Sequence, residues 1–322
     1  MRPQPIMDRC ARFACRVIAV ALFVVPAASA QAATGLDWLA GQQNADGSYG
    51  GTPASLATPV QSTAAVLRAY QALGLGAGAS HSTGLAFLGS DPEINTEFLA
   101  RKIIAGAQAG GDVSAWLATL LTHQNPDGGF GDQAGYDSSV LDTAFALEAL
   151  AVAGYANAEV IARAIFYLAQ QQANGGFRLS AANDGSVHLT ALAMTALQRY
   201  AFHYNLAGQL DKARAFLLSR QSAVGGWADD TETALALTAI VPFTSDTSLY
   251  AASLGALRAG QRADGSWLGD SYTTALALRA LQLAENTAPP PVMPTTGSFT
   301  GRVVNDATGV PLVGAFVAID QP

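Results

Sequence analysis

The chain of 322 residues has little of what a metal or thiol site needs. Its two cysteines, Cys10 and Cys15, lie in an N-terminal segment that we expect to be removed, so the remaining chain has no thiol for a disulfide, a nucleophile or a metal. The four histidines fall in unlike contexts: His81, His123, His188 and His203. We therefore predict no metal site and no cofactor.

The N-terminal segment has the composition of an export signal. Four arginines precede the apolar run VIAVALFVV, and small residues follow at Ala28 and Ala30. This order is typical of a signal peptide, which we place at residues 1–30. The pattern predicts a secreted, periplasmic or cell-surface protein.

Basic clusters and further long apolar runs are also missing. Removing residues 1–30 takes away four arginines and one aspartate and moves the formal charge from −7 to −10. An acidic chain without basic clusters argues against a nucleic-acid partner. No later run approaches the roughly 18 apolar residues of a membrane helix, so we expect no membrane span in the mature chain.

One turn sequence, by contrast, is repeated five times. Each copy holds a glutamine, a Gly-Gly or Gly-Ser pair and an aromatic residue six positions after the glutamine. A glycine past a helix end can close its last turn, and the glutamine amide can satisfy loose groups at neighbouring helix ends. We interpret the turn as structural, with these pairs: Gln43 and Tyr49, Gln124 and Phe130, Gln171 and Phe177, Gln221 and Trp227, Gln261 and Trp267.

Each turn lies between two helical patterns of different kinds. An amphipathic stretch precedes it, and a stretch rich in Ala and Leu follows it. Successive aromatics are 81, 47, 50 and 40 residues apart, so the first gap is expected to hold a degenerate unit that kept its helices and lost its turn. Small apolar helices are typical of an inner layer. We predict an all-α fold, an α/α toroid of six helix pairs, with an open superhelix as the alternative.

The segment KARAFLLSRQSAVGGW, residues 212–227, resembles the QW motif of squalene and oxidosqualene cyclases. The other four copies match it in the glutamine, glycine and aromatic positions, and the similarity covers residues 35–285. The resemblance implies the α/α toroid shared by terpene cyclases, protein prenyltransferase β subunits, complement-type thioester domains and cobalamin-binding proteins. A shared fold does not fix the function.

Two activities of this fold need residues that the mature sequence lacks. A zinc prenyltransferase of the resembled family needs Asp, Cys and His ligands, and a thioester domain needs a reactive cysteine. A class II terpene cyclase uses an Asp-rich acid, DxDD, and the nearest match is ADDTET at residues 228–233. The candidate catalytic groups are weak, since each could be a helix cap or a structural side chain: Asp142, Asp230, Glu232 and His188.

Polar residues near the starts of the Ala/Leu helices could converge at one mouth of the ring. We name five candidate ligand-binding residues, which could equally be helix caps: Asp137, Asp142, Thr143, His188 and Tyr272. The partner would be a small molecule, a glycan or a protein. We therefore favour a non-catalytic toroid that binds a ligand or displays a surface, with a terpene-cyclase-like enzyme that uses a non-standard acid as the alternative.

The amino-acid composition changes at the C-terminal end of the sequence. Residues 286–297 are rich in proline and read as a stiff linker. Residues 298–322 alternate like two strands around a turn and resemble the opening of a carboxypeptidase-regulatory-like β-sandwich. Two strands are only marginally stable by themselves, so we interpret this piece as a truncated module or as one that borrows a partner strand.

Overall fold

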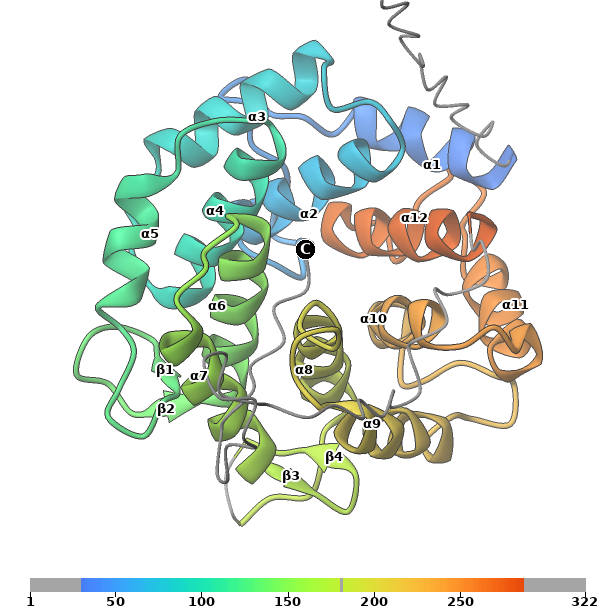
Figure 1. The fold of residues 1–322 in the computed structure, drawn as a ribbon. Helices are drawn as coiled ribbons and strands as arrows, with labels where there is room; N and C mark the ends of the chain where they lie inside the picture. Colours follow the sequence, from blue (N-terminus) through green and yellow to red (C-terminus); the bar gives the residue numbers. More distant parts are fainter. Residues whose placement is uncertain (1–29, 180–181, 287–322) are drawn as a thin grey trace, which may run out of the picture.

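The computed structural model describes residues 30–179 and 182–286, which form two concentric rings of helices (Figure 1). Residues 1–29 of the predicted signal peptide, the predicted linker beyond Asn286 and the predicted β segment 298–322 lie outside the described residues. Within the described ranges, no helix is long and apolar enough to cross a membrane.

The inner ring consists of six helices rich in alanine and leucine. Each contacts the next, and the last contacts the first, so the ring is closed. The predicted all-α toroid of six helix pairs is confirmed, and the open superhelix is wrong. The inner helices are α2 (Pro59–Ala72), α4 (Thr96–Gln108), α6 (Val140–Val152), α8 (Val187–Gln198), α10 (Asp230–Ile240) and α12 (Ser271–Glu285).

The outer ring is made of the amphipathic helices, which alternate with the inner ones along the chain (Figure 1). Short 3₁₀ segments, η1 (Val241–Phe243) and η2 (Thr247–Leu249), connect α10 to the last outer helix. The outer helices are α1 (Ala30–Ala40), α3 (Ala79–Ser90), α5 (Ser114–Leu121), α7 (Ala158–Gln170), α9 (Ala207–Ser219) and α11 (Ala251–Ala259).

The repeated glutamine fastens each turn to the outer helix of the next unit. The Nε2 atom of Gln124 donates to the Gly128 carbonyl at 2.9 Å and to the Val160 carbonyl of α7 at 2.9 Å. In the last copy, Gln261 donates to Gly265 at 2.9 Å and to the Thr34 hydroxyl of α1 at 3.1 Å. This last contact joins the two ends of the toroid.

The third copy differs from the prediction by one residue. The side chain that makes these bonds is Gln172, which donates to the Gly175 and Gln209 carbonyls at 3.0 and 2.9 Å, whereas the predicted Gln171 caps the end of α7. The turn is a two-residue hairpin of β3 (Gln172–Ala173) and β4 (Gly176–Phe177), and it is shorter by one residue than the other copies. A similar small pairing, β1 (Phe130–Gly131) with β2 (Ser138–Ser139), lies before α6.

The degenerate unit uses a buried lysine where the other units have the turn. Lys102 of α4 is 1 % exposed, and its ammonium group donates to the carbonyls of Asp91 and Glu93 at 2.7 and 2.8 Å. It also pairs with the Asp91 carboxylate at 2.6 Å. These bonds hold the connection between α3 and α4 against the inner ring.

Candidate functional site

A threonine at one register of every inner helix connects the ring to the turns. In five units its hydroxyl accepts the backbone N–H of the repeated aromatic residue, for example Thr143 from Phe130 at 2.9 Å. In the degenerate unit, Thr96 donates to the Gly131 carbonyl and lies 2.8 Å from His123 Nδ1. These buried threonines are Thr63, Thr96, Thr143, Thr190, Thr233 and Thr274.

Counting from this threonine places the residues that face the lumen in layers. Three positions in each inner helix are used: the residue two before the threonine, the residue two after it and the residue five after it. They follow one another at intervals of four and three residues, so they lie on one face of the helix. The residues two before the threonine line the mouth of the lumen: Gln61, Leu141, His188, Thr231 and Tyr272. The residues five after the threonine line the centre of the lumen: Arg68, Arg101, Glu148, Thr195, Thr238 and Arg279.

The mouth holds a cavity of about 450 Å³ at the N-terminal end of the inner helices. Its wall carries three carboxylates and one guanidinium, so its formal charge is negative. The apolar part comes from Leu56, Ala57, Leu141 and Phe145. The polar part comes from Gln61, Glu97, Arg101, His188, Asp229, Thr231, Glu232 and Tyr272.

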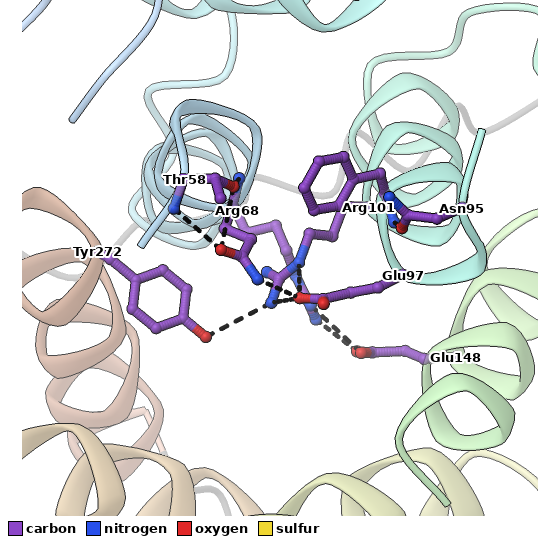
Figure 2. Close-up of polar contacts among 9 residues, drawn as sticks. Thr58, Arg68, Asn95, Glu97, Arg101, Glu148 and Tyr272 are labelled. Atoms are coloured by element: carbon purple, nitrogen blue, oxygen red, sulfur yellow. Dashed lines mark hydrogen bonds and ion pairs between the residues drawn. The ribbon is translucent and has the colours of Figure 1, made fainter. Parts of the chain in front are cut away.

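Arg101 forms the floor of this cavity. Its guanidinium carbon lies 4.5 Å from the centre of the Phe145 ring and 5.6 Å from that of Tyr272, two cation–π contacts that hold the charge in the lumen. Figure 2 shows Arg101 and Tyr272 pointing toward one another from α4 and α12. Glu97, one turn earlier in α4, accepts from Arg101 Nε and Nη2 at 2.9 and 2.7 Å.

The residues around Arg101 are themselves fixed by the helix starts. Gln61 closes a capping box with Thr58, and its Nε2 atom donates to Glu97 at 2.8 Å (Thr58 and Glu97 are labelled in Figure 2). Asp229 is the N-cap of α10 and accepts from the Glu232 N–H at 2.8 Å. The polar wall is therefore held in place before any ligand arrives.

The protonation states at the mouth follow from burial and nearby charge. Burial, and then the cation of Arg101, lower the pKa of His188, so this imidazole is neutral at pH 7. Burial, and then the charge of Asp229, raise the pKa of Glu232. The cavity thus contains one carboxyl group that takes up a proton more readily than usual.

Below Arg101 lies a second, much smaller cavity of about 30 Å³. Glu148 of α6 is 6 % exposed there and accepts two bonds from Arg68, one of them at 3.2 Å, and a third from Arg199 at 3.1 Å (Arg68 and Glu148 in Figure 2). Burial opposes the charge of Glu148, but the two arginines outweigh it and lower its pKa to about 2. Glu148 is therefore ionised in the folded protein.

The structure brings some of the predicted site residues together and separates others. His188, Tyr272 and Glu232 line the mouth cavity, whereas Asp142 and Asp230 do not. The hydroxyl group of Thr143 accepts the backbone N–H of Phe130 in the turn, and Asp137 is exposed in the loop before β2.

Asp142 and Asp230 each have a local setting outside the mouth. The Ser139 hydroxyl donates to Asp142 at 2.6 Å, and burial, together with the charges of Asp132 and Glu97, raises the pKa of Asp142 to about 6. Asp230 lies against the end of α11, where a Cβ on Gly260 would come within 2.7 Å of all three of its carboxyl atoms. Burial, and then Asp229, raise its pKa.

The sequence reading missed the charged residues of the lumen. Arg68, Glu148 and Arg279 each interrupt an Ala/Leu run five residues after the repeated threonine, and that position was the available signal. Arg101 occupies the same position in the degenerate unit, where no turn marks the register. Among the described residues, no three His, Asp or Glu side chains are grouped to hold a metal ion.

Comparison with known proteins agrees with this architecture. Residues 98–236 match the family model of the prenyltransferase alpha-alpha toroid domain. Comparison with curated protein sequences gives no match.

Three solved structures show the same fold. The apo type II terpene cyclase MstE from Scytonema is 18 % identical with a TM-score of 0.62, over 79 % of this chain and 97 % of that one. A protein from Actinoplanes is 19 % identical with a TM-score of 0.63, over 80 % and 99 %. The ent-copalyl diphosphate synthase from Streptomyces platensis is 21 % identical with a TM-score of 0.58, over 70 % and 50 %.

At these identities the likeness concerns the fold and leaves the activity open. The family model and the solved structures agree with the closed double ring of helices. The chain therefore has an α/α-toroid fold, and its residues 98–236 are similar to the prenyltransferase toroid domain.

Proposed function

We propose that the toroid is a non-catalytic binding module whose mouth cavity takes a small ligand rich in hydroxyl or amino groups, such as a sugar. The lining of the cavity carries this proposal. Glu97, Asp229 and Glu232 offer carboxylate acceptors in the same wall as the aromatic side chains of Phe145 and Tyr272. A volume of about 450 Å³ lies in the usual range of small-molecule sites.

The same geometry argues against cyclisation of a long isoprenoid. The layer of Arg101, Phe145 and Tyr272 closes the lumen, and the space beneath it is about 30 Å³. A polyprenyl chain needs a deep apolar cavity, and charged arginines there would be poor neighbours for a carbocation. The position of the arginine layer therefore favours binding at the mouth over chemistry in the lumen.

A terpene-cyclase-like enzyme is the second candidate. It is favoured by one observation, the raised pKa of Glu232 on the cavity wall, since a carboxyl group that holds its proton can act as an acid. The likeness to type II terpene cyclases is compatible with it but concerns the fold. In this reading Glu232 would take the place of the missing Asp-rich motif.

Ligand binding can be tested with the purified chain and a panel of mono- and disaccharides, amino sugars and simple amines. We expect at least one class to bind, with titration calorimetry or ligand-observed NMR as the measurement. Glu232→Gln and His188→Ala should each weaken the binding about tenfold, the loss of one good polar contact. The matched control is Glu159→Gln on the outer helix α7, which should bind as the unaltered chain does.

Two results would contradict the proposal. The first is the absence of binding across the whole panel, and the second is binding that neither mouth variant weakens. Conversion of squalene or a prenyl diphosphate to a cyclic product, lost in a well-folded Glu232→Gln variant, would support the enzyme instead.

We also propose that the chain is exported, because the arginines and the apolar run of residues 1–30 have the composition of a signal peptide. N-terminal sequencing of the exported product should give a start near Gln31 or Thr34. Recovery of Met1 would contradict the proposal.

A further inference from the structure

The central layer of the lumen carries more positive than negative charge. Arg68, Arg199 and Arg279 surround the single carboxylate Glu148, while Arg101 is neutralised separately by Glu97. Three guanidinium groups against one carboxylate leave a formal charge of +2 at this point. Unbalanced charge in a partly buried site is costly unless something compensates it.

Arg279 has no partner of its own in this layer. No hydrogen bond or ion pair joins its guanidinium group to any residue that the structure describes, although it lines the small central cavity. A guanidinium has five N–H donors, so the cavity wall offers a set of unused donors. The Nε atom of Arg68 is also buried without a partner.

The electrostatic setting of Arg279 favours an anion beside it. Burial, and then the cation of Arg68, lower the pKa of Arg279 to about 9, and Glu148 offsets this only in part. An arginine is normally protonated well above pH 12. Arg279 thus stays cationic at pH 7, and a second negative charge beside Glu148 would stabilise its charged form.

The size of the cavity limits what that charge can be. About 30 Å³ is room for one or two water-sized bodies, and Arg101, Phe145 and Tyr272, which line both cavities, separate this space from the mouth. Thr195 and Thr238 donate their hydroxyl protons to carbonyls of their own helices, both at 2.8 Å, so the arginines and the Tyr272 hydroxyl are the donors that remain. A monatomic anion fits this space, whereas a phosphate or a ligand carboxylate with its carbon chain does not.

We propose that the central cavity binds one halide ion, chloride in ordinary solution, held by the guanidinium group of Arg279 and the Nε–H of Arg68. The ion completes a layer in which Glu148 neutralises one guanidinium charge and the halide a second. Arg199, whose side chain is 38 % exposed, borders this layer at the C-terminal end of α8, the end opposite the mouth. The site is separate from the proposed mouth ligand.

The test uses the full chain at constant ionic strength, with sodium chloride replaced stepwise by sodium gluconate, whose anion is too large for the cavity. We expect chloride to raise the Tm saturably by about 2–4 °C relative to gluconate, as a ligand of the folded state does. Bromide should act like chloride, and crystals soaked in bromide should give an anomalous peak beside Arg279.

Two variants separate this site from general salt effects. Arg279→Gln should lose the chloride-dependent rise in Tm, whereas Arg214→Gln, which alters a surface pair with Asp211, should keep it. Equal melting of the unaltered chain in chloride and gluconate would overturn the proposal. So would bromide peaks confined to the surface, a result that does not depend on whether Arg279→Gln folds.

Discussion

Replacing Glu148 by glutamine measures how much the central charge layer contributes to stability. Glutamine keeps the shape of the side chain and one acceptor oxygen but removes the charge that faces Arg68 and Arg199. The pKa of Glu148 falls from its ordinary value of 4.5 to about 2, and one pKa unit corresponds to 1.36 kcal/mol. We therefore expect Glu148→Gln to lower the free energy of unfolding by about 3 kcal/mol at pH 7.

The pH dependence gives this prediction its sign. A carboxyl group whose pKa is depressed by folding contributes its full stability above its unfolded pKa, and the contribution is lost as pH falls through the folded value. The difference between the unaltered chain and Glu148→Gln should hence be constant above about pH 5 and shrink toward zero near pH 2. Urea is the suitable denaturant, because guanidinium chloride would add chloride.

The control is Glu159→Gln, since Glu159 is exposed in the first turn of α7 and should change stability by no more than about 0.5 kcal/mol. A Glu148→Gln variant as stable as the unaltered chain at pH 7 would refute the reasoning, as would a loss of stability that does not depend on pH. If the cause is excess positive charge, adding Arg279→Gln to Glu148→Gln should restore part of the loss.

The same urea assay tests two further residues. Asp142 has its pKa raised from 3.8 to about 6, so the cost of its ionisation to folding builds up between these two pH values and is complete above about pH 6. Asp142→Asn should therefore raise the free energy of unfolding at pH 8, by at most about 3 kcal/mol, and change it little at pH 4. Equal effects at both pH values would contradict this. Trp227 is 8 % exposed and donates to the Leu217 carbonyl at 2.9 Å, so Trp227→Ala should cost about 3–5 kcal/mol, and Trp227→Phe less. A negligible loss of stability in Trp227→Ala would show that the turn does not stabilise the fold. Elemental analysis should find no stoichiometric zinc, and one zinc per chain would contradict the predicted lack of a metal site.

The fold was predictable because local rules and the repeat agreed. The spacing of glutamine, glycine and aromatic residue marked the helix ends, and the Ala/Leu runs marked the inner layer. The missing turn of the second unit was also foreseen, although its replacement by Lys102 was not. In the sequence, a lysine inside an inner helix gives no sign of which carbonyls it will reach.

The error at Gln171 has a simple physical origin. In the other four turns the glutamine amide reaches a carbonyl four residues later, whereas Gln172 reaches Gly175, three residues later. The tight turn puts Asn174 at a positive φ of 52°. The predicted spacing of six to the aromatic was carried over from the longer turns and so pointed to the neighbouring glutamine.

The site was predictable only in part, because position near a helix start does not fix the direction of a side chain. His188, Glu232 and Tyr272 face the lumen, whereas Asp142 and Asp230 are directed to a turn serine and to a neighbouring helix end. Direction depends on the register within each helix. The repeated threonine supplies that register, but its role becomes visible only with the turn hydrogen bonds.

The two sides of each inner helix carry different kinds of information. The side of the threonine faces the turn, and the same residue type stands there in all six helices. The lumen side, five residues later, holds arginine, glutamate or threonine. Because these two sets of contacts are independent, lumen residues can change without disturbing the turns that close the ring. The repeat motif therefore specifies the toroid, whereas the two binding proposals rest on the arginine layer and on the carboxylates at the mouth.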